Sequence, residues 1–244
     1  MNGKIYIVGT GPGSLDYLST RAIDALKNSE VIVGYKTYIN LIAPLCEGKT
    51  IHSSGMRKEV ERCQQVIDIA LTGKTVSMIS SGDSGVYGMA GIILEMAAKT
   101  NPDLEVEVVP GITSALSSAS LAGAALMNDF AVISLSDLMT PWSVIEKRID
   151  KAADGDFVMS IYNPKSKERV EQIAICQAIV SKYRGGNTPV AIIKNAMRQE
   201  SNVTLTTLDK MLDCHIDMTT TVIIGNSQTF VLNNKMITPR GYTL

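Results

Sequence analysis

Histidine and cysteine are scarce in this sequence of 244 residues. It has two histidines and four cysteines, and no two cysteines form a Cys-x-x-Cys pair. Cys214 and His215 are adjacent in the chain, a geometry that suits two ligands of one ion poorly. The composition therefore predicts no protein-held metal and cysteines that are ordinary core or surface residues. It also leaves no evident Ser-His or Cys-His pair for nucleophilic catalysis.

An excess of positive charge and long apolar runs are missing as well. The 23 lysines and arginines nearly balance the 24 aspartates and glutamates, so no basic stripe is available to neutralise nucleic-acid phosphates. Every apolar run falls below the ~18 to 20 residues of a membrane span. The run at 5–8 is too short for a signal peptide. We therefore expect a cytoplasmic protein with neither a nucleic-acid nor a membrane partner.

Aliphatic residues are abundant in this sequence. Hydrophobic residues make up 45% of the chain and charged residues 19%, but aromatic residues only 5%. This balance is typical of a compact globular protein. With 12 methionines present, we expect aliphatic cores in which methionine fills gaps.

Hydrophobic periodicity predicts alternating strands and helices in the first half of the chain. The predicted strands are 4–8, 31–33, 75–79 and 105–109, and the predicted helices are 18–27, 59–71 and 86–98. Ser19 or Thr20 is the expected N-cap of the first helix. Alternation of this kind indicates an α/β fold with a parallel sheet.

A segment rich in serine, alanine and glycine, 113–125, separates this half from a second alternation. There the predicted strands are 130–135, 157–162, 190–193 and 220–224, the helices are 142–152 and 170–182, and 203–206 is a possible antiparallel edge strand. We therefore predict two α/β domains, residues 1–115 and 116–244.

The first glycine-rich loop, Gly9 to Gly13, invites a dinucleotide-binding interpretation. A dinucleotide fingerprint needs G-x-G-x-x-G leading into a helix, with an acidic residue about 20 residues further on. Here Pro12 removes a backbone donor within the turn and Ser14 stands at the third glycine position. Glu30 precedes the second strand, so a dinucleotide-dependent oxidoreductase stays an alternative.

Two more glycine-containing loops follow predicted strands. Residues 80–88 follow one strand, and Pro110-Gly111 follows another and opens the small-residue segment. Asp83 could pair with a cationic ligand or simply cap the next helix. Because ligands of open α/β sheets bind beyond the carboxyl ends of the strands, we expect the three loops to line one crevice.

A cationic segment follows the strand at 157–162. Lys165, Lys167 and Arg169 stand at the predicted start of a helix, where positive charge opposes the helix dipole. A solvated helix start explains them, but an anionic ligand explains them better.

Taken together, these motifs resemble the tetrapyrrole methylase family. The resemblance is carried by G-x-G-P-G at 9–13, G-D at 82–83 and V-P-G-x-T at 109–113. Further motifs resemble the branch that methylates C-17 of precorrin-3B or cobalt-factor III; they are GYKTY at 34–38, SSGMR at 53–57, ISLSDL at 133–138 and YNPKS at 162–166.

The resemblance implies two α/β domains with an inter-domain cleft, a homodimer and S-adenosylmethionine as cofactor. The implied reaction is methylation at C-17 of a cobalamin-pathway tetrapyrrole with ring contraction. An electron-rich tetrapyrrole supplies the attacking carbon, so no protein nucleophile is needed. A sibling methylase acting at C-11 or on uroporphyrinogen, and a family member retained as a binding protein, are alternatives, and the sequence leaves open whether the substrate already carries cobalt.

The resemblance also implies site residues. Cofactor contacts would fall on Pro12, Ser81, Gly82, Asp83, Val86, Thr113, Ser114, Asn163, Ala196 and Gly225. Two positions depart from the family pattern, since Ser84 replaces a proline of many relatives and Ala196 a glycine of some. The expected partners of substrate carboxylates are Lys36, Arg57, Lys58, Lys165 and Arg198, and the candidate catalytic bases, by position alone, are Asp83 and Asp137.

Overall fold

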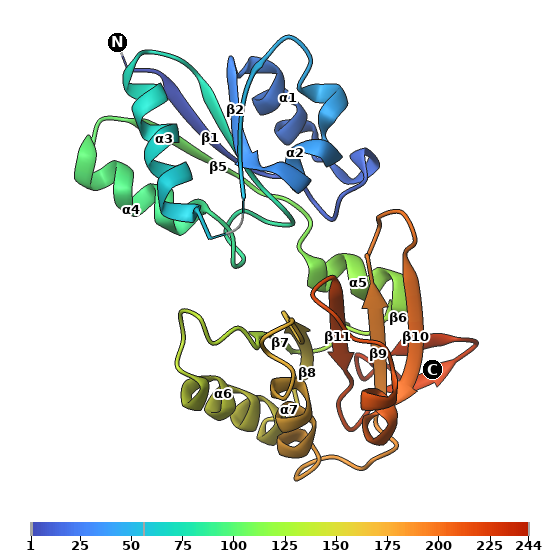
Figure 1. Cartoon of the computed structure of the whole chain (residues 1–244). Coiled ribbons are helices and arrows are strands. Elements are labelled where there is room, and N and C mark those ends of the chain that lie inside the picture. The colour runs from blue at the N-terminus through green and yellow to red at the C-terminus, as the bar shows by residue number, and fades with distance from the viewer. Residues whose placement is uncertain (1, 56, 244) are drawn as a thin grey trace. The chain divides into compact units, whose positions relative to one another are not determined.

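The computed structural model of the chain describes residues 2–55 and 57–243. The chain separates into two compact units between Thr113 and Ser114 (Figure 1). The domain boundary predicted from the sequence lies two residues later, between residues 115 and 116, and it stays a prediction. Within the described residues, no helix is long and apolar enough to cross a membrane.

The first unit is built on a five-stranded sheet in the order β3-β2-β4-β1-β5, in which every pair is parallel. Its strands are β1 (Lys4–Gly9), β2 (Val31–Tyr35), β3 (Thr50–Ser54), β4 (Val76–Ser80) and β5 (Glu105–Val109). The predicted parallel sheet is confirmed. The sequence pattern did not indicate β3, an edge strand of mostly polar residues that lacks a buried apolar face.

Helices cover both faces of this sheet (Figure 1). They are α1 (Thr20–Asn28), α2 (Lys36–Leu41), α3 (Glu59–Leu71) and α4 (Ala90–Thr100). Side chains of a strand alternate between faces, so Ile5 and Ile7 pack with α3 and α4, whereas Tyr6 and Val8 pack with α1 and α2. Ser19 caps α1 as predicted, its hydroxyl accepting the Ala22 N–H at 3.1 Å.

The second unit has a mixed sheet in the order β10-β9-β11-β8-β7. Its strands are β7 (Phe130–Ser134), β8 (Val158–Tyr162), β9 (Pro189–Lys194), β10 (Asn202–Thr207) and β11 (Thr220–Ile224). Only β7 and β8 pair in parallel, while β11 runs antiparallel to both β8 and β9. The antiparallel edge strand predicted at 203–206 is confirmed as β10.

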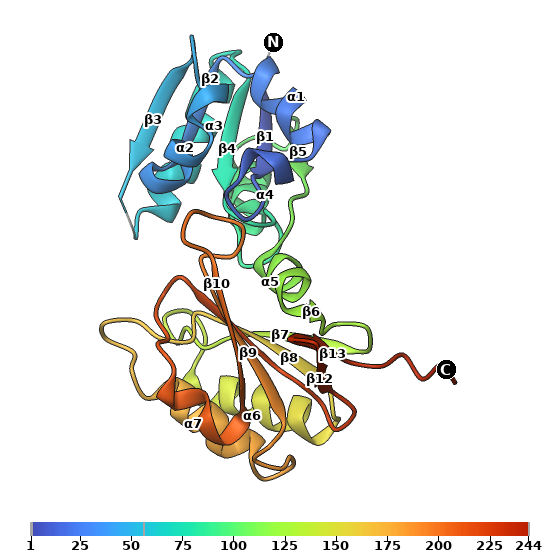
Figure 2. The same cartoon turned by 90° about the vertical axis from the view of Figure 1, so that its right-hand side faces the viewer.

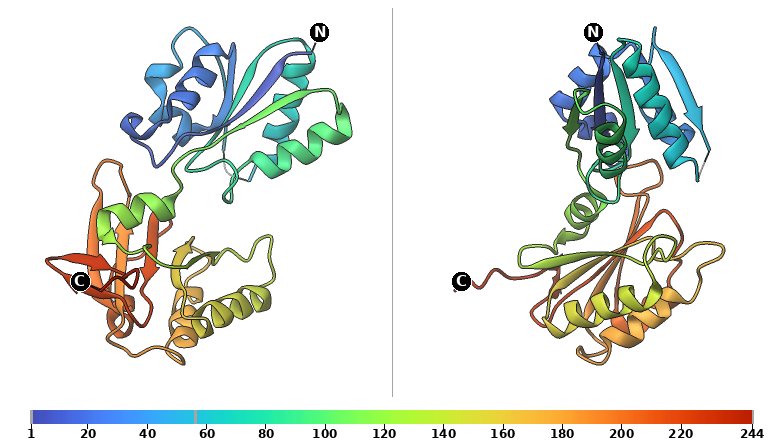
Figure 3. Two further views of the ribbon diagram at one scale, coloured as in Figure 1. Left: turned by 180° about the vertical axis from the view of Figure 1, so that it is seen from behind. Right: turned by 90° about the vertical axis from the view of Figure 1, so that its left-hand side faces the viewer.

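Different elements cover the two faces of this second sheet (Figures 2 and 3). On one face, α6 (Trp142–Asp154) and α7 (Gln172–Val180) enclose an aliphatic core. On the other lie α5 (Ser114–Ala122) and the small sheet β12-β13-β6, with β6 at Gly123–Ala124, β12 at Phe230–Leu232 and β13 at Lys235–Ile237. The two faces therefore have separate aliphatic cores.

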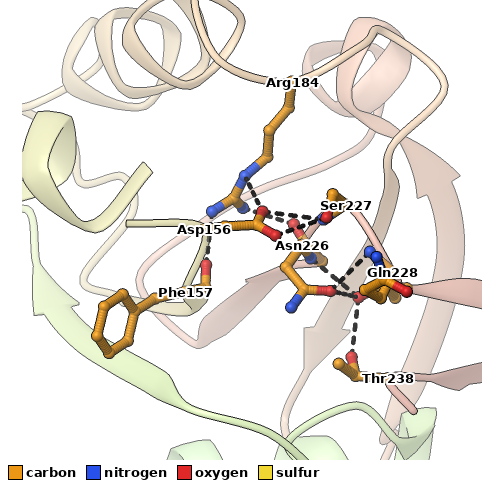
Figure 4. A network of polar contacts seen from close by, with 9 residues as sticks. Asp156, Phe157, Arg184, Asn226, Ser227, Gln228 and Thr238 are labelled. Carbon is orange, nitrogen blue, oxygen red and sulfur yellow. Dashed lines mark hydrogen bonds and ion pairs between the residues drawn. The ribbon is translucent and has the colours of Figure 1, made fainter. Parts of the chain in front are cut away.

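A buried arginine ties together one end of this sheet (Figure 4). The Arg184 guanidinium donates to the carbonyl oxygens of Gly225 at 2.5 Å and Phe157 at 2.6 Å. Its Nε lies 3.7 Å from the Asp156 carboxylate, which in turn accepts the backbone N–H and the hydroxyl of Ser227. Burial lowers the pKa of Arg184, and the charge of Asp156 acts in the opposite direction. Three loops at this end are thus held by one side chain.

We expect Arg184→Met to lower the free energy of unfolding by about 2 to 3 kcal/mol, because two carbonyl oxygens lose a charged donor inside the protein. Urea unfolding followed by circular dichroism measures the change. Arg148→Met, at an exposed position of α6, is the matched control and should change stability little. Equal stability of the two variants would contradict this role for Arg184.

Candidate active site

Three loops meet at the carboxyl edge of the first sheet. The strands β4, β1 and β5 are neighbours and run parallel, so their carboxyl ends share one edge. The segments that leave them are Gly9 to Gly13, Ser81 to Gly88 and Pro110-Gly111. The structure therefore brings together the three glycine-containing loops singled out in the sequence.

The first two loops are joined through their backbones. The N–H of Gly11 donates to the carbonyl of Gly82 at 3.0 Å, and the N–H of Gly82 donates back to Gly11 at 2.8 Å. Both glycines have left-handed φ values, 67° and 66°, which most side chains disfavour. Glycine is needed here for backbone conformation, and the two loops form one rigid piece.

The third loop packs against this piece too closely for any side chain. A Cβ on Gly9 would lie 2.7 Å from the backbone nitrogen of Gly111, and one on Gly111 would clash with the Gly82 carbonyl oxygen. The glycines of all three loops therefore form a contact of backbone on backbone.

Asp83 links two of the loops with its carboxylate. One oxygen accepts the N–H of Gly85 at 2.8 Å and the other accepts the N–H of Gly111 at 3.0 Å. The helix-capping alternative for Asp83 is wrong, because α4 begins at Ala90 and not at the predicted residue 86. A carboxylate held by two backbone donors suits positioning better than proton transfer.

The serine that departs from the family pattern also has a structural partner. Ser84 is fully buried and its hydroxyl donates to the carbonyl of Val109 at 3.1 Å. It thereby joins the β4 loop to the end of β5. The replacement of proline by serine adds a link between the loops.

Three candidate substrate contacts lie along the same edge. Lys36 is the first residue of α2, directly after β2, and Arg57 and Lys58 follow β3. Lys58 forms an exposed ion pair with Glu61 at 2.8 Å. The structure thus groups these three cations at the edge that carries the glycine loops.

A cavity of about 230 Å³ also opens at this edge, and of its lining residues only Ser81 has a role predicted from the sequence. Its lining includes Tyr35, Tyr38 and Tyr87. The motif GYKTY placed the first two at i, i+3 spacing, one turn apart at a strand-to-helix junction. This i, i+3 spacing is the sequence feature that could have indicated an aromatic pair here. A larger cavity, about 740 Å³, lies between β3 and α3. It is away from the glycine loops and is therefore the weaker candidate for the active site.

In the second unit, four of the predicted residues share one sheet edge. Asn163 and Lys165 follow β8, and Ala196 and Arg198 follow β9. Both strands are antiparallel to β11, so they point the same way and end at the same edge. Asn163 has a left-handed φ of 50°, and its amide donates to the Ser134 hydroxyl at 2.9 Å, which fixes its side chain beside the end of β7.

Gly225 does not belong to this group. It follows β11, which runs in the opposite direction, so it lies at the far edge of the sheet, roughly 16 Å of strand from Asn163. Its N–H donates to the Pro189 carbonyl, and its own carbonyl accepts from Arg184. The prediction of Gly225 as a cofactor contact is therefore not supported by its position.

Three other residues singled out in the sequence form hydrogen bonds of their own. The Ser114 hydroxyl is hydrogen-bonded to that of Thr221 at 2.5 Å, at the beginning of α5. Asp137, exposed in the loop after β7, accepts a hydrogen bond from Gln172 at 3.3 Å. Arg169, from the cationic segment, donates to the Asn163 carbonyl at 3.0 Å and so shapes the loop that carries Lys165.

The comparisons with known proteins fit this geometry. Residues 4–212 match the family model described as Tetrapyrrole (Corrin/Porphyrin) Methylases. The chain belongs to this family. The methylase is 49% identical, over 99% of its length, to a cobalt-factor III methyltransferase of Priestia megaterium, but spans only 46% of that relative. It is 47% identical to a probable cobalt-factor III C(17)-methyltransferase of Salmonella typhimurium, covering 98% of this chain and 99% of the relative.

A solved structure gives the same result. The methylase resembles the crystal structure of the methyltransferase CobJ with a TM-score of 0.90 and 34% sequence identity, over 97% of this chain and 100% of the other. These findings confirm the family, the two α/β domains and the methyltransferase activity in cobalamin biosynthesis. A uroporphyrin-III C-methyltransferase of Thermus thermophilus, which shares the fold with a TM-score of 0.72 at 22% sequence identity, was solved in complex with S-adenosylhomocysteine.

Two of the four cysteines of the methylase are core residues, in line with the prediction of ordinary core or surface cysteines. Cys63 and Cys176 lie in the two main cores, and burial raises the pKa of their thiols to about 11 and about 12. Both thiols therefore stay protonated at neutral pH and are poor nucleophiles. Over the described residues, no three His, Cys, Asp or Glu side chains gather as metal ligands.

We expect Gly111→Ala to lower the free energy of unfolding by roughly 1 to 3 kcal/mol, because its methyl group has no room between Gly9 and Gly82. The same substitution should abolish S-adenosylhomocysteine binding, measured by calorimetry. Gly91→Ala, in α4 with nothing within 4 Å, is the control and should raise stability by about 0.5 kcal/mol. Tight S-adenosylhomocysteine binding by Gly111→Ala would contradict a role for the loop junction in holding that ligand.

Proposed function

We propose that this chain transfers a methyl group from S-adenosylmethionine to C-17 of a cobalamin-pathway tetrapyrrole, with contraction of the macrocycle. Two similar relatives, in Priestia megaterium and Salmonella typhimurium, are named for cobalt-factor III, which makes cobalt-factor III the preferred substrate over precorrin-3B. The observation that carries the proposal is the close packing of Gly9, Gly82 and Gly111. Through this contact, the three glycine motifs that the chain shares with the family lie together at one edge of a parallel sheet.

The proposed donor contacts in the first unit come from its three loops. They are Pro12, Ser81, Gly82, Asp83, Val86 and Thr113. Close backbone approach at Gly82, the hydroxyls of Ser81 and Thr113 and the nearby Asp83 carboxylate fit a small, polar, cationic donor. In the second unit, the proposed donor contacts are Ser114, Asn163 and Ala196. Gly225 is not among them, because it lies at the opposite edge of the sheet.

The chain contributes positioning to the reaction. Bound S-adenosylmethionine supplies an electrophilic methyl group, and the tetrapyrrole supplies the carbon that attacks it. Holding reactants in line can lower a barrier by up to ~7 to 11 kcal/mol, and the rigid loop junction fits this role. Neither buried thiol can act as a nucleophile. Of the two candidate bases, Asp83 is hydrogen-bonded to the loop backbones, which leaves Asp137 as the candidate for a base in ring contraction.

Cationic side chains recognise the substrate in this proposal. A tetrapyrrole of this pathway carries several acetate and propionate groups. Lys36, Arg57 and Lys58 at the edge of the first sheet, and Lys165 and Arg198 at that of the second, are the proposed partners. The homodimer and the cytoplasmic location that we expect stay predictions.

The direct test is incubation of the protein with methyl-labelled S-adenosylmethionine and cobalt-factor III. We expect a product heavier by one methyl group, with the absorbance of a contracted macrocycle and the label at C-17 by NMR. A label at C-11 would instead indicate a sibling methylase. Binding of NAD without binding of S-adenosylmethionine would indicate a dinucleotide-dependent enzyme and contradict the proposal.

Charge reversal tests the substrate contacts separately. We expect Lys165→Glu to weaken cobalt-factor III binding roughly tenfold, a loss near 1.4 kcal/mol, since a carboxylate partner becomes a repulsive charge. S-adenosylhomocysteine affinity should stay unchanged. Lys147→Glu, exposed on α6, is the matched control. Equal loss of both ligands in Lys165→Glu would rule out this assignment.

A further inference from the structure

Tyr87 is held in a conformation that bulky residues seldom adopt. Its φ is 52°, in the left-handed region, and 60% of the residue is exposed. It lies between Gly85 and Gly88 in the loop that follows β4. A left-handed backbone and an exposed aromatic ring both oppose folded-state stability. This combination at a sheet edge that carries a binding site indicates a contact with a ligand.

Tyr87 lines the cavity of about 230 Å³ together with Tyr35 and Tyr38. The last two rings form an edge-to-face pair, with centroids 5.2 Å apart and planes at 83°. Pockets that enclose a whole small ligand usually measure about 300 to 1,000 Å³. A cavity of this size with aromatic walls can therefore accept one flat ring of a larger molecule.

The other side of the cavity is formed by an ion pair, Arg62 with Glu59. The buried guanidinium of Arg62 donates to the Gly55 carbonyl at 2.8 Å and to the Ser54 hydroxyl at 3.0 Å, and pairs with Glu59 at 3.2 Å. These bonds hold the segment that leads to Arg57 and Lys58. The aromatic wall, together with the cationic side chains of that segment, matches a pyrrole ring that bears carboxylate substituents.

The cavity lies beside the proposed donor site and shares one segment with it. Ser80, Ser81 and Gly88 line it on the β4 side. In the sheet, β4 is flanked by β2, which leads to Tyr35, and by β1, which leads to the first glycine loop. A ring seated against Tyr87 therefore lies next to the loop that contains Gly82 and Asp83.

We propose that Tyr87, with Tyr35 and Tyr38, forms an aromatic wall that packs against one pyrrole ring of the tetrapyrrole substrate. This inference rests on the proposed function, since it names the surface of that site which the macrocycle contacts. Tyr87 is a substrate-binding residue in this account, and its strained backbone keeps the ring at the cavity.

Three variants test the wall. Tyr87→Asn removes the ring but keeps a residue that tolerates the left-handed region. Tyr87→Phe keeps the ring. Tyr242→Asn, at a residue 76% exposed near the end of the chain, is the matched control. For each, cobalt-factor III affinity is measured by absorbance titration, S-adenosylhomocysteine affinity by calorimetry, KM and kcat by methyl transfer, and folding by thermal denaturation.

We expect Tyr87→Asn to weaken cobalt-factor III binding about tenfold, as removal of one stacked ring implies, and to raise KM by a similar factor. Its S-adenosylhomocysteine affinity and melting temperature should not fall. Tyr87→Phe should bind cobalt-factor III more tightly than Tyr87→Asn because it keeps the ring, and Tyr242→Asn should resemble the unmodified protein. If Tyr87→Asn is active and binds cobalt-factor III as tightly as the unmodified protein, or if it loses affinity for both ligands equally, the role of Tyr87 is wrong but the proposed function still stands. Absence of methyl transfer by the unmodified protein would overturn the proposed function.

Discussion

Three backbones in contact, with no side chain between them, determine how the first unit can bind a ligand. Gly9, Gly82 and Gly111 meet where the carboxyl ends of β1, β4 and β5 lie side by side, and the paired hydrogen bonds of Gly11 and Gly82 close the junction. The Asp83 carboxylate and the buried Ser84 hydroxyl add side-chain links to the same loops. A binding surface built in this way is fixed before any ligand arrives, so binding does not have to order the loops.

This rigidity suits a reaction in which the protein aligns two partners and supplies no nucleophile. Two of its four thiols are withdrawn from any substrate, since Cys63 and Cys176 are buried and protonated. The sheet edges present backbone amides, hydroxyls, tyrosine rings, cations and the Asp83 carboxylate. Such groups recognise and orient a donor and a polyanionic aromatic substrate. The second unit presents Asn163 and Lys165 at the shared end of β8 and β9, on a sheet braced at its other end by Arg184.

Much of this could be predicted from the sequence, because buried strands and capped helices have strong local patterns; α3 and β5 begin and end where the periodicity places them. Strand direction has no such pattern. The antiparallel course of β11 in the second sheet was therefore not foreseen, and Gly225 was grouped with residues at the opposite edge. Likewise α4 begins four residues late, because Tyr87 interrupts the helical pattern with a left-handed backbone that composition does not reveal. Long-range contacts, such as the Asp83 bond to Gly111, become visible only in three dimensions.

The central claim is that the glycine junction holds the methyl donor. Amide hydrogen exchange with and without S-adenosylhomocysteine tests it most directly, because these loops contain many backbone N–H groups whose exchange can be followed. We predict slower exchange with the ligand in residues 10–14, 81–86 and 111–115, and no change in the groove between β3 and α3 that contains His52 and Asp68. Protection confined to that groove, with the glycine loops unaffected, would contradict the account.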